Sequence, residues 1–122
     1  MVGIDIVQVS RLRRLLTEHA TADIDLFTPA ERDYCGAKRD RYPHLAARFA
    51  AKEAVLKALG SGLGPAMRWT DVEVVNAALG RPSVRLHGAV RALADARGCR
   101  VEITLSHTGD YAVAQAMLVG AA

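Results

Sequence analysis

Two acidic residues lie in segments that otherwise have the composition of buried structure. Asp5 interrupts the apolar run Val2–Val9, and Glu53 lies in the alanine-rich segment RFAAKEAVLKALG, residues 48–60. An unpaired carboxylate among apolar side chains is costly. Gly3 shares the strand face of Asp5 and has no side chain, which leaves space beside the acid. Two carboxylates suit magnesium, which keeps water and takes phosphate oxygens as its other ligands.

Each acid also has a structural interpretation. Asp5 could accept hydrogen bonds from a helix N-terminus or pair with an arginine. Glu53 and Lys57, spaced i and i+4, could form a surface pair worth about 0.3–0.5 kcal/mol. The Glu53 side of the helix favours a site, because small residues there would let a ligand approach the backbone; they are Ala46, Ala50 and Ala54. Three bases are then placed for phosphate charge: Arg48, Lys52 and Lys57.

His107 ends the alternating run 101–107 and stands at a turn, where ligand contacts concentrate. The same position suits a structural or rim histidine. Ser106 cannot form a nucleophile pair with it, since neighbouring strand residues point to opposite faces. The loop Gly60–Gly64 lacks the GK[ST] ending of a P-loop. These patterns argue against acyl-enzyme chemistry and against a P-loop nucleotide site.

Periodicity and capping signals predict the elements that must position these residues. The first strand, over 2–9, has two apolar faces, which predicts a central, covered strand. The other expected elements are a helix from the N-cap Ser10, a loop over 18–25, a helix from the capping box Thr28–Glu31 to about Gly36, a helix over 43–59 ended by Gly60, strands over 69–75 and 83–86 around a turn at 79–82, a helix over 88–97, and strands over 100–106 and 111–119. Together these elements predict an α+β fold with helices packed on a mostly antiparallel sheet.

Length and composition narrow the class of protein. The 122 residues suit one domain spanning 1–122, with 51% hydrophobic and 24% charged residues. No apolar run could cross a bilayer, and the N-terminus lacks the basic leader of a signal peptide. Cys35 and Cys99 lie outside any CxxC pattern, which fits a reducing cytoplasm. A net charge of +3 and few aromatics do not predict nucleic-acid binding.

Several motifs occur in an order that resembles one known family. They are GIDIV near the N-terminus, FTPAE at 27–31, RFAAKEAVLKALGSGLG at 48–64, WTDVEV at 69–74, GRP at 80–82 and TLSHTGDYAVA at 104–114. The chain resembles the holo-acyl-carrier-protein synthases, the small bacterial class of 4′-phosphopantetheinyl transferases, over nearly its whole length. GRP in place of GKP and TLSH in place of SLSH are mild departures.

The resemblance implies an activity and a set of roles. A member of this family moves phosphopantetheine from coenzyme A to a serine of an apo acyl carrier protein and releases 3′,5′-ADP. Asp5 and Glu53 match the magnesium ligands, and Lys57 matches the lysine on the pyrophosphate. The other coenzyme-binding positions that match are Arg48, Lys52, Gly60, Ser61, Gly62 and His107. Lys52 has a second interpretation, in which its side chain only extends from the core towards solvent. The general base has two candidates, a direct carboxylate or a water molecule on the metal.

The resemblance also implies partners. Arg11, Arg13 and Arg14 match the basic surface that docks the acidic helix of the carrier, in fatty acid or polyketide biosynthesis. Family members of this size are homotrimers with active sites between subunits. Two other hypotheses stand beside the enzyme: a carrier-binding module without transfer activity, and a nucleic-acid binder. Asp5, Glu53 and Lys57 argue against the first, and the scattered aromatics argue against the second.

Overall fold

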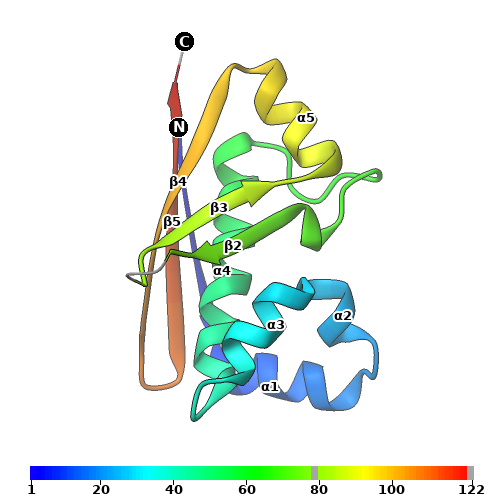
Figure 1. Cartoon of the computed structure of the whole chain (residues 1–122), viewed down its shortest axis with the longest axis vertical. Helices are drawn as coiled ribbons and strands as arrows, with labels where there is room; N and C mark the ends of the chain where they lie inside the picture. Colours follow the sequence, from blue (N-terminus) through cyan, green and yellow to red (C-terminus); the bar gives the residue numbers. More distant parts are fainter. Residues whose placement is uncertain (78–79, 121–122) are drawn as a thin grey trace.

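The structure is a computed structural model, and it describes residues 1–77 and 80–120. The elements in chain order are β1 (Val2–Gln8), α1 (Val9–Glu18), α2 (Ala22–Leu26), α3 (Pro29–Gly36), α4 (Arg41–Leu59), a 3-10 turn (Trp69–Asp71), β2 (Val72–Asn76), β3 (Pro82–Leu86), α5 (Gly88–Ala96), β4 (Cys99–Thr108) and β5 (Tyr111–Gly120) (Figure 1). The predicted α+β class is confirmed. Part of the predicted turn at 79–82 lies outside the described residues.

Two antiparallel sheets flank the long helix α4. One has the strand order β1-β5-β4 and the other is the β2-β3 hairpin. Figure 1 shows α4 running along the molecule, with α1, α2 and α3 gathered at one end and α5 at the other. Both hydrophobic clusters of the core include residues of α4. The helix is therefore the element against which the rest of the chain packs.

Small residues bring α4 very close to the three-stranded sheet. A Cβ added at Gly3 of β1 would lie 2.0 Å from the Ala54 carbonyl oxygen and 2.7 Å from the Ala58 nitrogen. Ala50 and Ala54 are completely buried and share a cluster with Ala114 and Ala116 of β5. The expectation that Gly3 and this alanine face leave room for a ligand is therefore wrong. They make room for the helix backbone instead.

β1 is an edge strand, so the prediction of a central, covered strand is also wrong. Its inner face, with Gly3, packs on α4, whereas Ile4 and Ile6 on the outer face are 61% and 64% exposed. Both faces are apolar, as expected, but no element of the described chain covers the outer one. The pattern of apolar residues along a strand indicates which faces are apolar. It does not indicate whether the surface that covers a face belongs to the same chain.

Local capping signals located most helix ends. Thr28 and Glu31 form the predicted capping box of α3, and Gly60 ends α4 in the left-handed conformation, with φ +73°. α4 begins two residues earlier than expected, because the Asp40 side chain accepts a hydrogen bond from the Tyr42 amide. The predicted loop over 18–25 contains part of α2.

Ser10 was predicted to be the N-cap of α1, and this is wrong. The helix starts at Val9 with Gln8 at the cap position, and Ser10 lies within the first turn. No helix in the described part of the chain combines the length and hydropathy that a membrane span requires.

Candidate functional site

An open groove of about 650 Å³ lies where β1, α1 and α4 meet. Asp5 of β1 and Glu53 of α4 both line it, which confirms that the fold brings the two predicted carboxylates together. Arg11, Arg14 and Leu15 contribute the wall formed by α1, and Phe49 adds an aromatic ring from α4. The groove therefore combines acid, base and apolar surface within one hollow.

Lys57 pairs with Asp5 and not with Glu53. Its Nζ lies 2.9 Å from Asp5 Oδ1 and 3.1 Å from the Ile4 carbonyl oxygen. The Asp5 side chain is 17% exposed and the Lys57 side chain 53% exposed, so the ammonium lies at the rim. The hydrogen bond that Lys57 donates to the Asp5 carboxylate raises the pKa of Lys57, which stays cationic at neutral pH. The alternative of an isolated Glu53–Lys57 surface pair does not occur.

Glu53 is the acid whose ionisation the site opposes. Partial burial raises the pKa of Glu53, the charge of Asp5 raises it further, and Lys57 acts in the opposite direction. A cation bound nearby would stabilise the ionised form of a carboxyl group that lies next to a second acid. The structure thus supplies a physical reason for positive charge to enter the groove.

The two carboxylates of Asp5 and Glu53 suit a magnesium ion, which keeps water and substrate ligands, better than a cation that takes all its ligands from the protein. Within the described ranges there is no group of three or more Asp, Glu, His or Cys residues that could hold a metal. Two carboxylates leave most of an octahedral shell to water and to substrate oxygens, which is the usual arrangement for Mg²⁺ at phosphates. Asp5 and Glu53 are the residues that would hold it.

The three arginines of α1 divide into two groups. Arg11 and Arg14 line the groove. Arg13 points away from it: its guanidinium lies 3.7 Å from Asp40 Oδ2 and 4.8 Å from the centre of the Tyr42 ring. The predicted basic face is present, but only Arg11 and Arg14 accompany the two acids.

Arg48 and His107 lie in a second groove, of about 190 Å³, which shares no lining residue with the first. Arg48 is 3% exposed and donates to the His44 carbonyl oxygen at 3.1 Å and to Asn76 Oδ1 at 2.5 Å. Its Nε is buried without a partner among the described residues. His107 meets His44 edge to face, with ring centres 5.3 Å apart. Such a pocket is suited to an anionic or aromatic ligand.

Lys52 does not belong to either groove, so its predicted contact with the coenzyme is wrong. The side chain is completely buried, and its Nζ donates to Glu31 Oε1 at 2.8 Å and to the carbonyl oxygens of Trp69 and Val72. Burial lowers the pKa of Lys52, and the charge of Glu31 opposes this effect. With its three donors used, Lys52 joins α4 to α3, to the 3-10 turn and to the first residue of β2.

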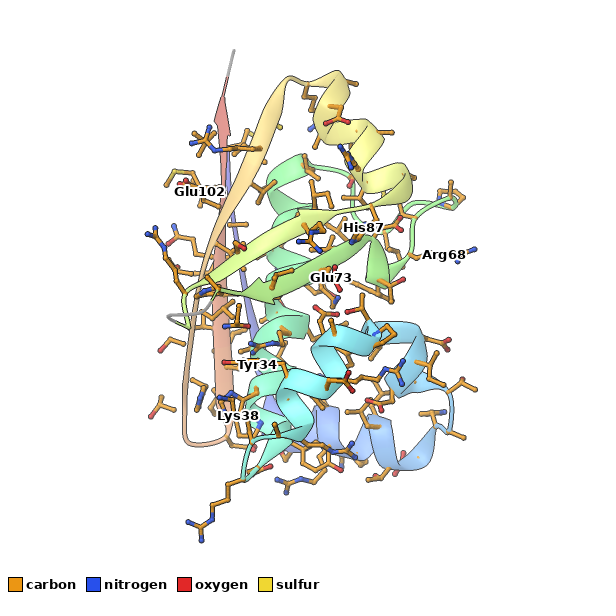
Figure 2. All side chains as sticks on the ribbon, viewed as in Figure 1. Tyr34, Lys38, Arg68, Glu73, His87 and Glu102 are labelled. Carbon is orange, nitrogen blue, oxygen red and sulfur yellow. The ribbon has the colours of Figure 1, made fainter. Side chains whose placement is uncertain are left out.

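Glu31 was identified only as a helix cap, and the sequence missed its second role. Beyond the capping box, its Oε1 pairs with Lys52 and its Oε2 accepts the Val74 amide at 2.8 Å. A related contact joins β2 to the start of α5: Glu73 Oε1 lies 3.0 Å from His87 Nε2 (Figure 2). These partners lie up to 43 residues apart in the chain, so spacing alone could not reveal them.

The loop after α4 continues from the helix that carries Glu53 and Lys57. Gly60 and Gly62 both adopt positive φ, and Ser61 Oγ donates to the Gly62 carbonyl oxygen at 2.9 Å. None of these three residues lines either groove. Their contact with the coenzyme stays a prediction. His44, which lines the second groove, carried no spacing signal that could have identified it.

Comparison with known proteins finds relatives over nearly the whole chain. Residues 1–116 match the family model described as the 4′-phosphopantetheinyl transferase superfamily. A holo-[acyl-carrier-protein] synthase of Geobacter sulfurreducens is 49% identical over 118 residues, covering 95% of this chain and 94% of the relative.

Solved structures show the same fold. The crystal structure of the holo-[acyl-carrier-protein] synthase of Neisseria meningitidis has a TM-score of 0.87 at 30% identity, over 97% of this chain and 96% of that one. The Helicobacter pylori enzyme, in complex with coenzyme A, has a TM-score of 0.85 at 25% identity, over 98% of this chain and 100% of that one. From its fold, its paired carboxylates and these matches, the chain belongs to the 4′-phosphopantetheinyl transferase superfamily.

Proposed function

We propose that this chain transfers 4′-phosphopantetheine from coenzyme A to a serine of an apo acyl carrier protein, with magnesium as cofactor and 3′,5′-ADP as the second product. The observation that carries the proposal is that Asp5 and Glu53 line one groove beside the basic face of α1, with Lys57 paired to Asp5. Relatives named for this reaction cover nearly the same length of chain, and one related structure contains coenzyme A.

In the proposed reaction the serine oxygen forms a bond to the β-phosphorus of coenzyme A. The bond from that phosphorus to the bridging oxygen breaks, and 3′,5′-ADP leaves with the electron pair. Asp5 and Glu53 would hold a magnesium ion, which supplies positive charge to the pyrophosphate when bound. Lys57, a cation at the rim, binds pyrophosphate oxygens and offsets the charge on the leaving group. The serine proton goes to a general base, and a carboxylate that lines the groove is one candidate.

Arg11 and Arg14 are proposed to receive the carrier. Both flank the groove, so an acidic helix bound to them would lie beside Asp5 and Glu53. Opposite charges steer such an encounter and raise the association rate more than they raise the final affinity. Arg13 is already engaged by Asp40 and Tyr42, and we assign it a smaller share of the docking surface.

We further propose a homotrimer with active sites between subunits. The outer face of the β1-β5 ladder exposes a row of large apolar side chains: Val2, Ile4, Ile6 and Met117. A second copy would cover this face. The arrangement also gives a use to the second groove: Arg48 and His107 of one subunit would bind the coenzyme whose pyrophosphate lies at the Asp5–Glu53 groove of the adjacent subunit.

Transfer is tested by incubating the chain with coenzyme A, Mg²⁺ and purified apo carrier proteins, and by measuring the intact mass of each carrier. We expect one phosphopantetheine group to be added to one serine, and we expect a chelator to stop the reaction. A carrier that binds with unchanged mass would support the non-catalytic module instead.

The shared site is tested by mixing two weakened variants, Glu53→Gln and His107→Ala. In an interfacial trimer the mixture contains some sites with both native residues, so activity should exceed that of either variant alone. A mixture no more active than its components, together with sedimentation as a monomer, would contradict the assembly.

A further inference from the structure

Helix α1 receives its N-terminal cap from the far end of the chain. Gln8, at the cap position, makes no side-chain capping bond. Asp110 supplies one instead: its Oδ1 accepts the Ser10 amide at 2.9 Å, and its Oδ2 accepts the Ser10 hydroxyl at 2.6 Å. The Asp110 carbonyl oxygen also accepts the Val9 amide at 2.7 Å. These hydrogen bonds from Ser10 lower the pKa of the Asp110 carboxyl, which stays ionised at neutral pH.

Asp110 lies on a well-defined platform. It occupies the turn between β4 and β5, which closes where Thr108 pairs with Tyr111. Gly109 completes the turn with φ +56°, a conformation that other residues rarely adopt. Because both strands belong to the three-stranded sheet, the tip is held by ten registered pairs, from Cys99–Gly120 to Thr108–Tyr111. The cap is therefore placed by the sheet and not by a flexible loop.

The position of this cap matters because α1 follows β1 directly. β1 carries Asp5 and ends at Gln8, and α1 carries Arg11 and Arg14 within its first two turns. Asp110 forms hydrogen bonds with Val9 and Ser10, where the chain bends between these two elements. A ten-residue helix has little stability of its own, so a cap and a carboxylate at its N-terminus affect how fully its first turn forms.

We propose that Asp110 is a positioning residue for carrier docking: from the tip of the β4-β5 hairpin it holds the first turn of α1 so that Arg11 and Arg14 face the carrier beside Asp5 and Glu53. The inference rests on the proposed function. It assigns Asp110 no contact with coenzyme A or with the reacting atoms.

The test compares Asp110→Ala with Asp110→Asn and with the matched control Asp33→Ala, which removes the same charge from the exposed side of α3. Asp110→Ala should raise the KM for the apo carrier about three- to tenfold, the range expected from a lost helix cap. The KM for coenzyme A and the kcat at saturating carrier should stay close to those of the native chain. Asp110→Asn keeps an acceptor for the Ser10 amide and should recover most of the loss.

A second measurement does not depend on activity. Amide hydrogen exchange at Ser10, Arg11 and Leu12 should become about three- to tenfold faster in Asp110→Ala and stay unchanged in Asp33→Ala. If the native chain transfers no phosphopantetheine, the proposed function fails while this measurement still decides whether Asp110 caps α1. An unchanged carrier KM in Asp110→Ala would overturn the docking role, as would equal losses with both substrates. Unchanged exchange would overturn the cap itself.

Discussion

Replacing Gly3 with alanine tests the close contact on which the site is built. The added Cβ would lie 2.0 Å from the Ala54 carbonyl oxygen, whereas ordinary contacts begin at 3.4 Å. The difference, 3.4 less 2.0, means that β1 and α4 must separate by about 1.4 Å, and both obstacles are backbone atoms that cannot rotate away. Overpacking of a core costs about 1–3 kcal/mol, and we expect the upper end of that range here.

The same separation should also disturb the reaction. Asp5 lies two residues after Gly3 on β1, and Glu53 immediately precedes Ala54 on α4. Forcing the two backbones apart therefore moves the two carboxylates relative to each other. A misplacement of about 1 Å can reduce an enzymatic rate about 100-fold, so Gly3→Ala should lose activity well beyond its loss of stability.

Urea unfolding at fixed protein concentration, followed by circular dichroism, measures the first effect. The transfer rate as a function of Mg²⁺ concentration measures the second. Gly36→Ala is the control, because a Cβ there meets nothing within 4 Å and the change should alter stability by about 1 kcal/mol or less. Gly3→Ala with native stability and native activity would refute the proposed packing of β1 on α4.

Three further predictions follow from buried groups. Burial raises the pKa of Cys35 to about 11 from 9.0, so the native chain should lose up to about 2–3 kcal/mol of stability between pH 9 and 11, and Cys35→Ala should lack this loss in alkaline urea titrations. Burial acts to raise the pKa of Glu73, but the hydrogen bonds with Thr28 and His87 together outweigh it and lower the pKa; the stability this confers is present above pH 4.5 and is lost as the pH falls, so the native chain and Glu73→Gln should converge in acid unfolding curves. Lys52→Met leaves Glu31 buried without its cation and should cost about 3–5 kcal/mol in urea unfolding, whereas a change at an exposed cation such as Arg39→Met should cost about 0.5 kcal/mol or less.

The sequence predicted the elements whose signals are local. The capping box at Thr28–Glu31 and the left-handed Gly60 are set by residues within one turn of each other, and the start of α3 and the C-terminal end of α4 followed from them. The structure also brings Asp5 and Glu53 to one groove, as expected for carboxylates in apolar segments, and their role as metal ligands stays a prediction.

The predictions that the structure contradicts, and the contacts that the sequence missed, share a different physical origin. Asp110 caps α1 from 100 residues away, and Lys52 meets Glu31 across 21, so no window along the chain contains both partners. Gly3 was interpreted as space for a ligand because a glycine does not reveal what approaches it. The exposed outer face of β1 shows the same limit: periodicity identifies an apolar face, but it does not identify the surface that covers it.

Asp5 and Glu53 are proposed to act together in the transfer, and the rates of single and double variants measure whether they do. Single-turnover formation of holo carrier, followed by intact mass at increasing Mg²⁺, should be compared among the native chain, Asp5→Asn, Glu53→Gln and the double variant. We predict that each single variant loses most of the rate, and that the double variant loses little more, because the two acids act as one unit. A native transfer rate in either single variant would contradict the joint role of Asp5 and Glu53.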